Sequence, residues 1–125
     1  MSRVLLDAGA LIAIDRHDRA MWERLAVARR DSTPLLTHVG VVGQVWRGRR
    51  QARLAQALRA IKVAPLEASM GRSIGALLAA SRTDDIVDAA LVLLSVDGDR
   101  IYTSDPDDLL TLGAAAERDI EIVAV

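Results

Sequence analysis

Three aspartates stand where a carboxylate could take part in chemistry. Asp7 directly follows the apolar run 4–6, and Asp105 directly follows the run 100–104. Asp88 lies inside the apolar stretch 86–94, where a carboxylate is seldom buried without a partner. If the three side chains meet, their hard oxygen atoms favour Mg²⁺ or Mn²⁺ as the bound ion. Such an ion polarises a phosphoryl group and activates water, so this trio favours phosphodiester hydrolysis.

Each aspartate also has a purely structural interpretation, because aspartate after a strand often forms a turn or caps a helix. Thr83 is a candidate N-cap for the helix that carries Asp88, and Asp84 and Asp85 suit the positive end of its dipole. With that start, Asp88 falls beyond the first turn, where the dipole effect fades, and capping does not explain it. Asp85 precedes Asp88 by three residues, so the two lie close together on the helix.

The elements that must position these residues alternate between strands and helices. Strands are predicted at 4–6, 34–38, 62–66, 100–104 and 120–125. Helices are predicted at 8–14, 19–29, 41–47, 51–61, 67–80, 84–94 and 107–115. This alternation predicts an α/β sandwich around a mainly parallel sheet, with the strand that contains Pro65 at an edge.

A parallel sheet would bring two of the aspartates together. Asp7 and Asp105 follow strands whose carboxyl ends share one rim, which is where ligands bind in open parallel sheets. In the helix 84–94, Ile86, Ala89 and Leu93 follow the spacing of a buried stripe. If this helix packs with its first half towards the rim, Asp88 joins the other two carboxylates.

Composition narrows the class of protein. The 125 residues predict a single domain over 1–125, and 51% hydrophobic residues suffice for a core. The absence of cysteine excludes disulfides and thiolate metal sites and suggests a reducing compartment. No run approaches the ~18 apolar residues of a membrane span. We therefore expect a soluble, cytoplasmic protein with no membrane contact.

Charge is unevenly distributed along the chain. Residues 1–62 carry twelve basic and five acidic side chains, whereas residues 63–125 carry four basic and twelve acidic ones. This asymmetry fits an anionic ligand on one part and a cation or basic partner on the other, unless the halves interleave in space. The high apolar fraction of so short a chain also predicts apolar surface for a dimer or a partner.

Four segments, in order and spread over essentially the whole chain, carry a family resemblance: 4–13, 41–48, 85–90 and 103–109. Together they resemble the PIN-domain family, and within it the VapC-like toxins of bacterial toxin–antitoxin pairs. The resemblance implies a PIN-like α/β/α sandwich and a ribonuclease that uses Mg²⁺ or Mn²⁺. It also implies a homodimer that a cognate antitoxin inhibits. Asp7, Asp88 and Asp105 would be the catalytic and metal-binding acids, with Asp85 and Asp107 in support.

The chain departs from the family pattern at two places. Gln44 stands where the family usually has glutamate, and it keeps one carbonyl oxygen but loses the charge. Position 8 or 9 often carries a hydroxyl in the family, whereas this chain has Ala8 and Gly9. The alternative is therefore a catalytically weakened PIN-like module that binds antitoxin or RNA without efficient cleavage.

A basic stretch follows the second motif. Arg47, Arg49, Arg50 and Arg53 lie beside Trp46 and could contact RNA phosphates. A solvated helix face explains them equally well.

A few remaining polar and aromatic residues favour structural roles. His17 and His38 are predicted at the surface or as caps, and Ser104 as a turn hydroxyl. Trp22 and the segment 11–14 could line a groove for the antitoxin, although a place in the core is favoured.

Overall fold

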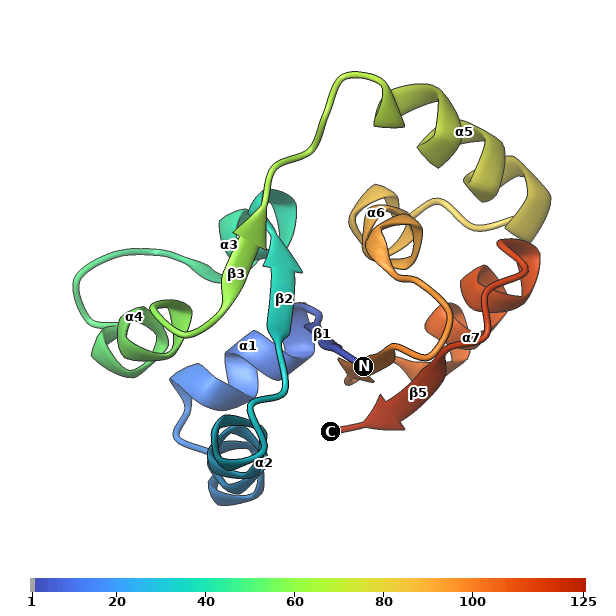
Figure 1. The fold of residues 1–125 in the computed structure, drawn as a ribbon. Coiled ribbons are helices and arrows are strands. Elements are labelled where there is room, and N and C mark those ends of the chain that lie inside the picture. Colours follow the sequence, from blue (N-terminus) through green and yellow to red (C-terminus); the bar gives the residue numbers. More distant parts are fainter. Residues whose placement is uncertain (1) are drawn as a thin grey trace.

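A computed structural model describes residues 2–125 as an α/β/α sandwich around one five-stranded sheet (Figure 1). The strands are β1 (Val4–Leu6), β2 (Leu35–His38), β3 (Lys62–Ala64), β4 (Arg100–Thr103) and β5 (Glu121–Ala124). Their order is β3-β2-β1-β4-β5, and every neighbouring pair is parallel. The predicted α/β/α sandwich with a mainly parallel sheet is confirmed, and β3 lies at an edge as Pro65 indicated.

Seven helices lie on the two faces of the sheet within residues 2–125. They are α1 (Ala8–Asp15), α2 (Arg19–Arg30), α3 (Val39–Val45), α4 (Ala52–Leu58), α5 (Met70–Ser81), α6 (Ile86–Leu94) and α7 (Pro106–Ala115). Side chains alternate across β1: Val4 and Leu6 pack with α1 to α4, whereas Leu5 packs with α5 to α7. None of these helices, all within residues 2–125, has both the length and the apolar character needed to cross a membrane.

The two charged halves of the chain remain largely separate in space. Residues 1–62 supply α1 to α4 on one face, and residues 63–125 supply α5 to α7 on the other. Figure 1 shows this separation, with α1 to α4 on one side and α5 to α7 on the other. The asymmetry read along the sequence is therefore an asymmetry between the helical layers.

Helix α6 starts later than predicted. Its N-cap is Asp85, whose side chain accepts a hydrogen bond from the Asp88 amide at 2.9 Å. Thr83, the predicted cap, instead shares a hydrogen bond with the Ser81 hydroxyl at 2.7 Å. Ile86 becomes the first helical residue and is 57% exposed, so the predicted buried stripe is wrong there. The buried residues of α6 are Ala89, Ala90, Leu91 and Val92.

Helix α3 ends earlier than predicted because the Gln51 side chain replaces its next turn. The Gln51 amide donates to the Val45 carbonyl at 2.9 Å, and its oxygen accepts from the amides of Arg47 and Gly48. These bonds satisfy backbone groups that a longer helix would have paired. Arg47 therefore lies in a pinned loop rather than in a helix.

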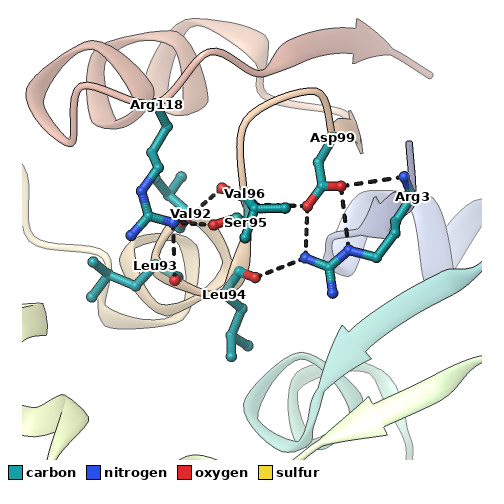
Figure 2. A network of polar contacts seen from close by, with 8 residues as sticks. All are labelled: Arg3, Val92, Leu93, Leu94, Ser95, Val96, Asp99 and Arg118. Carbon is teal, nitrogen blue, oxygen red and sulfur yellow. Dashed lines mark hydrogen bonds and ion pairs between the residues drawn. The ribbon is translucent and has the colours of Figure 1, made fainter. Parts of the chain in front are cut away.

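The carboxyl end of α6 is held by two arginines (Figure 2). The Arg118 guanidinium donates to the Ser95 carbonyl, just beyond the helix. Arg3 donates to the Leu94 carbonyl at 3.1 Å and pairs with Asp99 at 2.7 Å. Cations at a helix C-terminus satisfy its free carbonyls and complement its dipole. The end of α6 remote from Asp88 is thus firmly positioned.

Candidate functional site

Asp7 and Asp105 lie where two neighbouring strands send the chain in opposite directions: β1 leads on to β2, and β4 leads on to β5. They follow β1 and β4, which are neighbours, and the Asp7 amide donates to the Tyr102 carbonyl at 3.2 Å. The chain leaves β1 for α1 on one face and leaves β4 for α7 on the other. Ligands of open parallel sheets bind beyond the strand carboxyl ends at such a switch point. The sequence predicted the shared rim, and the strand order makes it the switch point.

Asp7 is a buried carboxylate with several donors. It is 5% exposed and caps α1 by accepting from the Ala10 amide at 2.9 Å. The Thr103 hydroxyl donates to its other oxygen. Burial raises the pKa of Asp7, and the hydrogen bonds from Thr103, Ala10, Ser104 and Gly9 act in the opposite direction. This carboxylate is held in one orientation by the turns around it.

Thr103 links the two rim aspartates, a role that the sequence analysis missed. Its buried hydroxyl donates to Asp7 and accepts from the Asp105 amide at 2.8 Å. A hydroxyl two residues before the amide that it binds is the pattern of a local side-chain turn, and that spacing was visible in the sequence. The contact with Asp7 was not visible, because the two residues are 96 positions apart.

Asp88 lies in the first turn of α6, whereas the sequence analysis placed it beyond that turn. The error came from the predicted start at Thr83. Burial is the larger cause and the negative charges of Asp85, Asp7, Asp105 and Asp108 are the smaller one; together they raise the pKa of Asp88 to about 7. The carboxylates at the ends of β1 and β4, Asp7 and Asp105, are therefore close enough to raise the pKa of Asp88 in the first turn of α6.

The start of α7 adds a second pair of acids. Asp105 is its N-cap but accepts no capping hydrogen bond, and its side chain lies within hydrogen-bonding reach of Asp108. That contact raises the pKa of Asp108, and the charges of Asp105, Asp85 and Asp107 add to the effect. Asp108 was not among the site residues predicted from the sequence. The sequence pattern could have indicated it, because Asp108 follows the N-cap Asp105 by three residues, just as Asp88 follows the N-cap Asp85.

The donor set fits a hard divalent cation by its chemistry. Asp7, Asp85, Asp88, Asp105, Asp107 and Asp108 form the acid cluster. All six offer carboxylate oxygen, which Mg²⁺ and Mn²⁺ prefer. Over residues 2–125, no group of three or more His, Asp or Glu side chains is arranged so that it could hold an ion. Mg²⁺ usually takes only one or two protein carboxylates and keeps several waters, so a smaller set fits it. That Asp7, Asp88 and Asp105 hold the ion together stays a prediction from the sequence.

No protein-family model matches the sequence, and no curated protein matches it.

Gln44 makes no hydrogen bond to the acid cluster. It is exposed near the end of α3, and its side chain makes no hydrogen bond to any of the residues 2–125. The structure thus shows no direct link between this position and the carboxylates.

The predicted basic stretch lies mostly in the loop between α3 and α4. Arg47 donates to the Trp46 and Gly43 carbonyls at 2.7 and 3.1 Å, so part of its guanidinium folds back on the loop. Arg49, Arg50 and Arg53 are exposed. Within residues 2–125, none of these arginines takes part in an ion pair. Trp46 beside them is 39% exposed.

Gly9 and Ser104 meet beside Asp7. A Cβ atom at Gly9 would lie 1.9 Å from the Ser104 hydroxyl oxygen, so only glycine fits there while Ser104 keeps this position. The Ser104 hydroxyl therefore occupies the space that a side chain at position 9 would fill. The chain lacks a hydroxyl at position 9 but holds one at nearly the same place.

An apolar groove of about 850 Å³ lies between α2 and α4. Trp22, Leu25 and Ala57 line it, together with Arg29 and Arg30. Trp22 is partly buried and packs against the core, and it also lines this groove. The segment 11–14 does not line it and instead supplies fully buried core residues.

Proposed function

We propose that this protein is a Mg²⁺- or Mn²⁺-dependent ribonuclease of the PIN-like, VapC-like class, and that it acts as the toxin of a toxin–antitoxin pair. The observation that carries the proposal is the meeting of Asp7 and Asp105 at the ends of neighbouring strands, where Thr103 bonds both residues. Their charges also act on Asp88 in α6. A cluster of this kind, at the switch point of a parallel sheet, favours a bound divalent cation.

The chain's own residues supply fixed positions for the chemistry. Thr103 orients Asp7 and the Asp105 backbone, and Asp85 caps the turn that carries Asp88. When bound, the cation would polarise a phosphoryl oxygen and lower the pKa of a bound water. Asp85 and Asp107 would support the site by adding negative charge around it.

The exposed arginine loop supports RNA as the substrate. Arg49, Arg50 and Arg53 have free charges, and the side chain of Gln51 holds the loop in one shape. Arginines at fixed positions suit contacts with phosphates, which position a nucleic acid without reading its sequence.

The protein partners are also part of the proposal. The groove between α2 and α4 has a mainly apolar lining that includes Arg29 and Arg30, which suits an amphipathic, acidic segment of an antitoxin. Ile86, Val96 and Leu110 are each more than half exposed and offer apolar surface for a homodimer. We propose the cytoplasm as the site of action.

A catalytically weakened module is the second candidate, and Gln44 favours it. Without the glutamate charge that the family usually has here, cation affinity would fall while the surfaces for RNA and antitoxin stayed intact.

RNA cleavage measured against Mg²⁺ and Mn²⁺ concentration, with EDTA as the blank, separates these functions. We expect the wild type to cut, Asp88→Asn to lose most of the activity, and Gln44→Glu to cut at a lower cation concentration. Asp119→Asn, an exposed carboxylate before β5, is the matched control.

Three other results of the cleavage assay would change the proposed function. If wild type and Gln44→Glu are both inactive at millimolar cation, the ribonuclease proposal fails. If only Gln44→Glu cuts, the natural protein is the weakened module. If Asp88→Asn cuts as well as wild type, Asp88 is a structural residue.

A further inference from the structure

His38 is a fully buried histidine between β2 and α6, as its 0% exposure shows. Its Nδ1 accepts a hydrogen bond from the Gly40 amide at 3.0 Å and so caps α3. Of the two positions predicted for His38, the cap is confirmed and the surface is wrong. Its Nε2 lies 2.9 Å from the Val87 carbonyl in the first turn of α6. Since a carbonyl only accepts, Nε2 carries the proton and Nδ1 does not. Burial lowers the pKa of His38, which suits this neutral ring.

The hydrogen bond from the His38 Nε2 to the Val87 carbonyl, here called the tether, joins the first turn of α6 to β2. Among residues 2–125, it is the one hydrogen bond that joins the segment 85–90 to an element other than α6. Asp85 and Ile86 are exposed, so burial holds that end of the turn weakly. The opposite end of α6 is already held by Arg3 and Arg118. Loss of the tether would therefore free the first turn while leaving the rest of the helix in place.

Gly40 makes room for the His38 ring. A Cβ atom at Gly40 would lie 2.9 Å from the imidazole Cε1 and 3.1 Å from Nδ1. A methyl group there would push the ring away without removing either of its nitrogens. This offers a second way to disturb the tether that leaves the histidine itself intact.

We infer that His38 is a positioning residue for Asp88: its Nε2–H, bound to the Val87 carbonyl, fixes the turn that carries Asp85 and Asp88 against Asp7 and Asp105. Its effect on catalysis rests on the proposed ribonuclease function. The tether itself does not, because it can be measured in the metal-free protein.

The two functions of the ring can be separated with amide side chains. The Asn oxygen can replace Nδ1 as the cap of α3, but its side chain is too short to reach Val87. The Gln amide nitrogen reaches as far as Nε2 and can restore the donor while losing the cap. We would compare His38→Asn, His38→Gln and Gly40→Ala with the wild type, using His17→Asn as the control at an exposed histidine.

Amide hydrogen exchange is the first measurement, made on the metal-free protein under conditions where every variant is folded. We expect the amides of residues 88–91 to exchange roughly tenfold faster in His38→Asn and Gly40→Ala, the scale of one buried hydrogen bond. His38→Gln and His17→Asn should keep the wild-type rates, and amides in β1 and β4 should be unchanged in all variants. If His38→Asn does not fold, Gly40→Ala provides the same comparison.

Two results would overturn the inference: unchanged exchange over 88–91 in Gly40→Ala, or equally fast exchange in the Asn and Gln variants. The second measurement is RNA cleavage, where we expect His38→Asn to lower kcat with KM unchanged and His38→Gln to restore kcat. If the wild type does not cleave, the proposed function fails while the exchange data still decide the tether.

Discussion

Replacing Asp88 by asparagine should stabilise the metal-free protein at pH 8. The pKa of Asp88 is raised to about 7 in the folded state, above its value of about 3.9 in an unfolded chain. Ionisation therefore opposes folding: the destabilisation is absent well below pH 4, grows as the pH rises, and is complete above pH 7. Asparagine removes the ionisation and with it this destabilisation.

The size of the effect follows from the environment of Asp88. A shift of roughly three pKa units corresponds to an upper limit of about 4 kcal/mol. Asp88 is only half-buried, and solvent screening reduces this to about 1–2 kcal/mol. Loss of a favourable charge at the α6 N-terminus offsets about 0.5 kcal/mol. We expect a net gain of about 1 kcal/mol at pH 8, or about 3–5 °C in Tm.

Thermal and urea unfolding in EDTA at pH 4.5 and pH 8 measure this difference directly. The advantage of Asp88→Asn should be largest at pH 8 and small at pH 4.5, whereas Asp119→Asn should change little at either pH. Millimolar Mg²⁺ should reverse the order at pH 8, because a cation bound to the folded state stabilises the wild type more. An Asp88→Asn variant that is destabilised equally at both pH values would refute a repulsive acid cluster.

Three further predictions concern the surroundings of the site and the assembly. Thr103→Val should lower the free energy of unfolding by about 1–3 kcal/mol, since it leaves the Asp7 carboxylate short of a donor; Thr103→Ser is the control in urea titrations. Gly9→Ala should destabilise by about 1–3 kcal/mol through its clash with Ser104, and the double variant with Ser104→Gly should recover most of the loss; additive effects would argue against the contact. Sedimentation at micromolar concentration should show a dimer, and Ile86→Lys should weaken it if that patch is the interface; a wild-type monomer would contradict the dimer.

Much of the fold was predictable because local pattern and chain connectivity dictate it. Short apolar runs alternating with helical patterns leave a parallel sheet as the simplest solution, since strands joined through helices run in the same direction. Asp7 and Asp105 directly follow two of those runs, so their meeting at one rim followed from the sequence. The edge position of β3 followed from Pro65 in the same way.

Only the tertiary structure decided how the acids are arranged. Thr83 and Asp85 are both acceptable caps by sequence, and the choice of Asp85 moved Asp88 into the first turn of α6. The bond from Thr103 to Asp7 and the one from His38 to Val87 span 96 and 49 residues. No local pattern encodes such contacts, because they form only when separate elements pack together. The separation of charge between the helical layers likewise depends on the strand order, which sends the helices of each half to a different face.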